Sequence, residues 1–100
     1  MYILIVEDDS TTADYISDGL RRAGFTCLRA ADGEEGLAAI LHGRYDATVM
    51  DIMLPRLDGL EVIRRARAVG VRTPIIGTAN RLASGARRRA VTKALETFAW

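Results

Sequence analysis

Hydrophobic and polar residues form alternating blocks along the chain that predict strands and helices in turn. Short apolar runs occupy residues 2–6, 25–30, 45–50 and 73–76, and each has the length of a buried strand. Between these runs, apolar residues recur every three or four positions, which is typical of amphipathic helices. The resulting order, βαβαβαβ, favours an α/β fold with a parallel sheet and right-handed crossovers.

Capping residues and glycines predict where the helices begin and end. Ser10 or Thr11 can cap the first helix, which Gly24 ends. Asp32 and Asp58 are each followed three residues later by a glutamate, which is the pattern of a capping box. The helix after Asp58 has an apolar stripe formed by Leu60, Val62, Ile63, Ala66 and Val69.

The pattern changes from residue 77 onward. Asn80 could cap one long helix that reaches about residue 98. Four basic residues lie largely off its apolar stripe and predict a solvated basic face: Arg87, Arg88, Arg89 and Lys93. We expect no direct binding of nucleic acid, because no aromatic or polar base-reading residue is interleaved with these charges.

Composition indicates one globular domain that spans residues 1–100, of which 49% are hydrophobic. The chain has neither a signal peptide nor an apolar run long enough to cross a membrane, so we expect no membrane partner. The single cysteine, Cys27, excludes an internal disulfide and favours a cytoplasmic location.

Charge is distributed unevenly along the chain. Residues 1–76 carry 9 basic and 12 acidic side chains, whereas residues 77–100 carry 5 basic and 1 acidic. The composition therefore shifts within one domain.

Acidic residues follow two of the predicted strands. Glu7, Asp8 and Asp9 come after the first strand, and Asp51 ends the third. Neighbouring parallel strands would bring these carboxylates to one edge of the sheet, where ligands of such sheets commonly bind. Crowded carboxylates repel one another, and a hard divalent ion such as Mg²⁺ prefers oxygen ligands. Taken singly, each acid would more often be a loop residue or a helix cap.

The segments around these acids, residues 3–9 and 51–59, resemble the receiver domain of two-component response regulators. The sequences Met-Leu-Pro at residues 53–55 and Leu-Asp-Gly at residues 57–59 are most similar to those of regulators with a winged-helix DNA-binding output domain. The resemblance covers residues 1 to about 76 and implies a flavodoxin-like sheet with strand order 2-1-3-4-5. Residues 77–100 are atypical, because they lack the family's fifth strand and its Lys-Pro ending. We therefore predict four strands, with the fifth missing or replaced by a helix.

The resemblance also implies roles for particular residues. Asp51 would accept a phosphoryl group from the phosphohistidine of a sensor histidine kinase. Asp8 and Asp51 would bind Mg²⁺ directly, Glu7 through a water molecule, and Met53 through its backbone carbonyl. Asp9 matches a variable position and is expected to cap a helix.

Two further residues have equivalents in the family. Thr78 matches a residue that hydrogen-bonds the phosphoryl group, but it comes one position early, which leaves its orientation open. Lys93 is the only lysine in the chain and hence the only candidate for the family's phosphoryl-binding lysine. The separation of 15 positions from Thr78 to Lys93 is too short for the usual helix, loop and strand. Phosphorylation is therefore expected to be inefficient.

The favoured interpretation is a phosphoacceptor signalling module, not an enzyme. One alternative is a degenerate or rebuilt receiver that acts as a dimerisation or protein-interaction module. Another is that residues 77–100 arise from a frameshift, a fusion or design. A strand-four edge without a fifth strand predicts a homodimer, formed by edge pairing or by exchange of residues 80–100. The competing possibility is a monomer whose last helix covers its own sheet.

Overall fold

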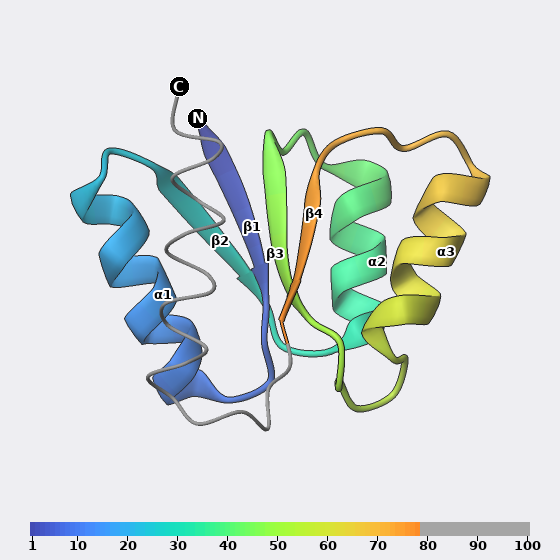
Figure 1. Ribbon diagram of the computed structural model, residues 1–100, viewed down its shortest axis with the longest axis horizontal. Coiled ribbons are helices and arrows are strands. Elements are labelled where there is room, and N and C mark those ends of the chain that lie inside the picture. Colours follow the sequence, from blue (N-terminus) through green and yellow to red (C-terminus); the bar gives the residue numbers. More distant parts are fainter. Residues whose placement is uncertain (79–100) are drawn as a thin grey trace.

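The computed structural model of the protein describes residues 1–78, which form a parallel β-sheet with helices on both faces (Figure 1). The strands lie in the order β2-β1-β3-β4, and every adjacent pair is parallel. This arrangement confirms the predicted flavodoxin-like fold. The predicted C-terminal helix, Lys93 and the question of a fifth strand lie outside the described residues. The elements are β1 (Tyr2–Val6), α1 (Ser10–Arg22), β2 (Thr26–Ala30), α2 (Gly33–His42), β3 (Ala47–Asp51), α3 (Gly59–Ala68) and β4 (Ile75–Thr78).

The core consists of two layers, one on each face of the sheet. Ile3 and Ile5 of β1 pack with the buried face of α1, whereas Leu4 and Val6 pack with α2 and α3. Successive side chains of a strand point to opposite faces, so one strand contributes to both layers. This explains why the apolar runs of β1 and β3 are nearly continuous, since both of their faces are covered. Within residues 1–78, no helix combines the length and the apolar character needed to cross a bilayer.

The N-terminus of α1 corrects the predicted cap at Ser10 or Thr11 and confirms the capping role expected for Asp9. Asp9, rather than Ser10 or Thr11, is the N-cap, and its carboxylate accepts a hydrogen bond from the backbone N–H of Thr12 at 2.9 Å. Each of these residue types can cap a helix, so the choice depends on which residue has the extended backbone conformation. Asp9 has that conformation, with φ −84° and ψ 114°.

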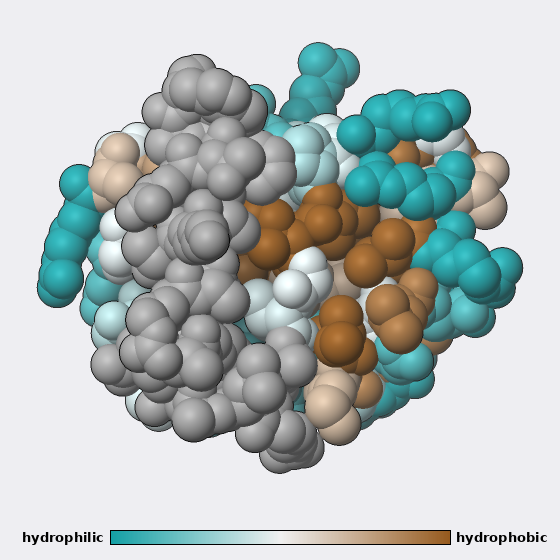
Figure 2. Space-filling model, viewed as in Figure 1, coloured by the Kyte–Doolittle hydropathy of each residue, from teal (hydrophilic) through white to brown (hydrophobic). Residues whose placement is uncertain are grey.

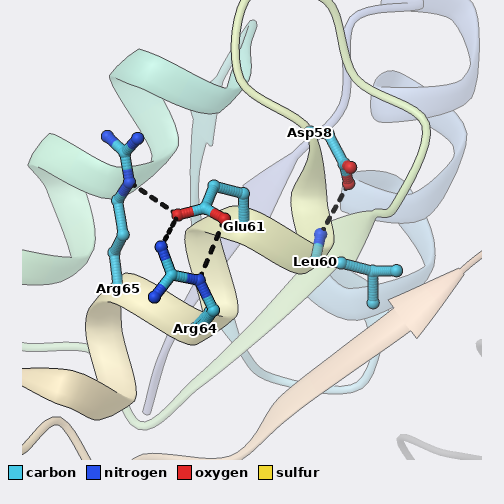
Figure 3. A network of polar contacts seen from close by, with 5 residues as sticks. All are labelled: Asp58, Leu60, Glu61, Arg64 and Arg65. Carbon is cyan, nitrogen blue, oxygen red and sulfur yellow. Dashed lines mark hydrogen bonds and ion pairs between the residues drawn. The ribbon is translucent and has the colours of Figure 1, made fainter.

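The two predicted capping boxes differ in the structure. Asp32 accepts a hydrogen bond from the Glu35 N–H at 2.9 Å, and Glu35 in turn accepts one from the Ala31 N–H at 3.0 Å. In the usual capping box the glutamate accepts from the N–H of the N-cap residue itself, whereas Glu35 accepts from the N–H of the residue before it. At α3, Asp58 accepts from the Leu60 N–H at 2.8 Å, while Glu61 pairs with two arginines instead (Figure 3). The prediction that Asp58 caps this helix is confirmed, but the predicted capping role of Glu61 is wrong.

The apolar stripe predicted for α3 is also narrower than expected. Val62 and Ala66 are fully buried, but Leu60 is 61% exposed and Val69 is 68% exposed. Leu60 precedes Val62 by two residues, or about 200° around the helix axis, so the two side chains face opposite directions. Val69 lies beyond the last helical residue, at the C-cap.

Cys27 is buried in β2 against the α1 layer. Burial raises the pKa of its thiol above the ordinary value, and this effect exceeds the opposing influence of Arg21. Cys27 therefore behaves as a small buried hydrophobic residue.

Candidate functional site

Three carboxylates converge at the edge of the sheet where the strands end. Glu7 and Asp8 follow β1, Asp51 is the last residue of β3, and these two strands are parallel neighbours. Each residue offers a carboxylate oxygen, and these oxygens all lie within 4.8 Å of one another. Glu7 and Asp51 are each only 1% exposed, whereas Asp8 is exposed to solvent. The structure therefore brings together three of the four acids predicted to converge.

This set of donors fits a hard divalent cation. All three groups present oxygen atoms, which Mg²⁺ prefers to nitrogen or sulfur. Two of the carboxylates are buried, where like charges at short distance disfavour ionisation unless a cation balances them. Asp9 stands apart from the cluster because its carboxylate caps α1.

The turn after β1 is held by both backbone and side-chain contacts. The Glu7 N–H donates to the Ala30 carbonyl of β2 at 3.1 Å, and the Asp9 N–H donates to Glu7 Oε2 at 3.1 Å. The guanidinium of Arg29, also on β2, donates to the backbone carbonyls of Glu7 and Asp8. Sequence reasoning missed Arg29, and the only available signal was a basic residue near the end of a strand adjacent to β1.

The loop after β3 folds back toward Asp51. The Met53 N–H donates to Asp51 Oδ1 at 2.9 Å, which fixes the rotation of this carboxylate. Farther along, the Gly59 N–H donates to the Ile52 carbonyl at 3.1 Å, so the start of α3 lies against the end of β3. A side chain at position 59 would place Cβ 2.6 Å from the Asp51 carbonyl oxygen. Only glycine allows α3 to begin this close to the candidate site.

Thr78 lies beside Asp51 in the sheet. The two residues are direct partners in the β3–β4 register, so their side chains share one face. Thr78 is 7% exposed, and its hydroxyl lies 3.5 Å from the Met50 carbonyl oxygen, at the limit of a hydrogen bond. The structure thus places Thr78 next to Asp51, while Lys93 lies outside the described residues.

Comparison with known proteins identifies the family. The family model of the response regulator receiver domain matches residues 3–98. The chain belongs to the receiver-domain family. The resemblance carried by residues 3–9 and 51–59 is thereby confirmed, and the receiver domain is of the type found in two-component response regulators.

The receiver domain is also similar to curated proteins from bacteria. It is 45% identical over 76 residues to the transcriptional regulatory protein DltR of Streptococcus agalactiae serotype III (strain NEM316). This match covers 76% of the present chain and 34% of DltR. The chain therefore spans about a third of the length of this relative.

Solved receiver structures share the fold. The receiver domain of the sensor histidine kinase PA1611 from Pseudomonas aeruginosa PAO1, with a magnesium ion in its active-site cleft, superposes with a TM-score of 0.74 at 27% identity. That comparison covers 92% of this chain and 94% of the other. TrrA of Thermotoga maritima, in complex with the histidine kinase ThkA, gives a TM-score of 0.74 at 29% identity, covering 82% and 71%.

Proposed function

We propose that this receiver domain accepts a phosphoryl group on Asp51 from the phosphohistidine of a sensor histidine kinase. The observation that carries the proposal is the position of the Asp51 carboxylate at the end of β3, with carboxylate oxygens of Glu7 and Asp8 within 4.8 Å. The complex of the similar protein TrrA with the kinase ThkA supports a kinase as partner. In this role the domain is a phosphoacceptor rather than an enzyme.

The proposed cofactor is Mg²⁺, held by Asp8 and Asp51 directly, by Glu7 through a water molecule and by the Met53 carbonyl. The oxygen-only donor set supports this assignment, as does the magnesium ion in the similar PA1611 receiver. When bound, Mg²⁺ would neutralise negative charge and so allow an anionic phosphoryl group to approach a carboxylate.

The residues of the chain have separate tasks in the proposed transfer. A carboxylate oxygen of Asp51 forms a bond to phosphorus while the phosphorus–nitrogen bond to the kinase histidine breaks. The Met53 N–H orients the Asp51 carboxylate through its bond to Oδ1. The Thr78 hydroxyl, beside Asp51 in the sheet, would donate a hydrogen bond to the transferred group.

Phosphorylation by an acyl phosphate in the presence of Mg²⁺ tests the proposal, with intact mass spectrometry as the measurement. We expect one phosphoryl group on the wild-type chain and none on Asp51→Asn. Omission of Mg²⁺ should prevent the reaction. The rate of modification should be about 10²-fold lower than at a site that also has a phosphoryl-binding lysine. The short separation between Thr78 and Lys93 in the sequence argues against Lys93 reaching Asp51.

Asp14→Asn is the matched control, because it removes an exposed carboxylate of α1. This variant should react like the wild type. Undiminished modification of Asp51→Asn would contradict the assignment of the phosphoacceptor. Rapid stoichiometric modification of the wild type would contradict only the inference about Lys93.

We further propose that the domain forms a homodimer and resides in the cytoplasm, where its kinase partner would act. Among residues 1–78, β4 is the outermost strand on its side of the sheet. Figure 2 shows hydrophobic residues gathered over the region where Figure 1 places β4 and the space between it and α3. Such surfaces are typical of interfaces. The buried free thiol of Cys27 is compatible with the reducing cytoplasm.

A further inference from the structure

Arg29 connects β2 to the turn that carries two of the three clustered acids. Its Nε and Nη2 atoms donate to the Glu7 carbonyl at 3.2 and 3.0 Å, and Nη2 also donates to the Asp8 carbonyl at 3.3 Å. Arg29 pairs with Ile5 in the β1–β2 register, so its side chain extends past the end of β1 to reach these carbonyls. The contact therefore joins residues that are 21 and 22 positions apart in sequence.

The two carbonyls that Arg29 binds flank the Cα atom of Asp8. One belongs to the peptide unit before Asp8 and the other to the peptide unit after it. Holding both units restricts the backbone dihedrals of Asp8, and these dihedrals set the direction of its side chain. Arginine suits this task because its planar guanidinium presents several donors in a fixed arrangement, whereas lysine has a single nitrogen.

Asp8 is the acid of the cluster that the packed core encloses least. Glu7 and Asp51 are 1% exposed and are held by the surrounding core, but Asp8 is exposed. The conformation of the turn therefore contributes to the direction of the Asp8 side chain. We propose that Arg29 is a positioning residue that directs the Asp8 carboxylate toward the cation site. This inference rests on the proposed Mg²⁺ site.

The charge of Arg29 and its hydrogen bonds have opposite consequences for cation binding. A positive guanidinium near the carboxylates repels a cation, so loss of its charge alone would strengthen binding of Mg²⁺. Loss of the hydrogen bonds would release the turn and weaken binding. The direction of the change in affinity therefore distinguishes a positioning role from a purely electrostatic one.

The test is a titration of the full chain with MgCl₂, followed by NMR shifts of the amides of residues 7–9 and 50–54. Arg29→Lys keeps the charge but not the fork of donors, and Arg29→Met removes both. We expect each variant to bind Mg²⁺ about tenfold more weakly than the wild type. This is at the lower end of the effect of residues that orient metal ligands without binding the metal. In metal-free protein, both should also shift the amides of residues 8 and 9. Arg44→Met, at the opposite edge of the sheet between α2 and β3, should leave affinity unchanged.

Three outcomes would overturn the inference. Wild-type affinity in both Arg29 variants would show that the contact does not position Asp8. Tighter binding by Arg29→Met together with unchanged binding by Arg29→Lys would show that only the charge matters. Absence of any Mg²⁺-dependent shift in the wild type would remove the proposed metal site, and this inference with it. If Arg29→Met does not fold by circular dichroism, Arg29→Lys alone still tests the inference: weaker binding of Mg²⁺ supports it, and wild-type affinity overturns it.

Discussion

Gly59 shows how a single residue without a side chain shapes the candidate site. A Cβ atom at this position would lie 2.6 Å from the Asp51 carbonyl oxygen and 2.7 Å from the Ile52 Cα atom. Both neighbours are backbone atoms, so neither can move aside by a change of rotamer. The end of β3 and the start of α3 would have to separate, and the Asp51 backbone would be displaced.

We therefore expect Gly59→Ala to lower the free energy of unfolding by about 1–3 kcal/mol, the usual cost of overpacking. Urea denaturation measures this change. Gly19→Ala is the control, because position 19 lies inside α1 and a Cβ atom added there would have no neighbour within 4 Å. It should stabilise the protein by about 0.5–1 kcal/mol through helix propensity. Equal effects of the two substitutions would contradict this account.

Glu61 provides the clearest pH-dependent contribution among the described residues. Hydrogen bonds from Arg64 and Arg65 lower the pKa of its carboxyl from 4.5 to about 2 (Figure 3). Between these values the unfolded chain binds a proton at this position and the folded chain does not. The stabilisation by Glu61 is therefore complete above pH 4.5 and is lost as the pH falls toward 2.

Thermal unfolding of wild type and Glu61→Gln at several pH values checks this prediction. The wild type should have the higher Tm at neutral pH, and the difference should shrink between about pH 4.5 and pH 2. In a background with Arg64→Met and Arg65→Met, the same change should have no such pH dependence. A difference that stays constant down to pH 2 would rule out this ion-paired network as the source.

Residue types predicted the acids of the site better than the contacts around them. Glu7, Asp8 and Asp51 could be assigned because each follows an apolar run, and the ends of parallel strands meet at one edge. Arg29 could not be assigned in this way, because its role depends on the adjacency of β1 and β2 and on the length of its side chain. A local sequence pattern shows neither which strands are adjacent nor which groups a long side chain can reach.

At the scale of elements, the strands were easier to predict than the surfaces of the helices. Apolar runs indicated all four strands. The central strands β1 and β3 are buried along nearly their whole length, whereas the edge strands β2 and β4 are partly exposed. Helix α3 was harder, because its sequence offers apolar side chains on more than one side. Only packing against the sheet and α2 selects Val62 and Ala66 as the buried pair.

At the scale of the molecule, the order of the strands followed from the family resemblance and from general rules of connection. Four apolar runs alternating with helices restrict the topology to parallel arrangements, but they do not determine which strands are neighbours. The receiver resemblance added the order that the structure shows, β2-β1-β3-β4. The composition shift after residue 76 falls almost entirely outside the described residues, so its structural consequence stays a prediction.

The outer edge of β4 has the geometry needed for the proposed dimer. The carbonyls of Pro74 and Thr78 accept hydrogen bonds from Thr48 and Ile52 N–H on the β3 side. Because successive backbone groups of a strand point in alternate directions, the N–H and C=O groups of Ile75 and Gly77 point away from β3. Among the described residues, no strand lies beyond β4 to accept them. A second copy of the chain could therefore pair along this edge in a closed, two-fold contact.

Gly77→Pro tests the dimer because proline removes the outward N–H of residue 77 while leaving the β3 ladder intact. Light scattering at micromolar concentration should give about twice the chain mass of 10.9 kDa for the wild type and a mass near 10.9 kDa for Gly77→Pro. Gly77→Ala is the matched control, because it keeps the N–H, and among the described residues its added Cβ would approach a side-chain methyl of Ile52, Cγ2, at 3.1 Å rather than any backbone atom. It should remain dimeric. A monomeric wild type would refute the dimer, and a dimeric Gly77→Pro that retains its fold would show that the contact does not use this edge.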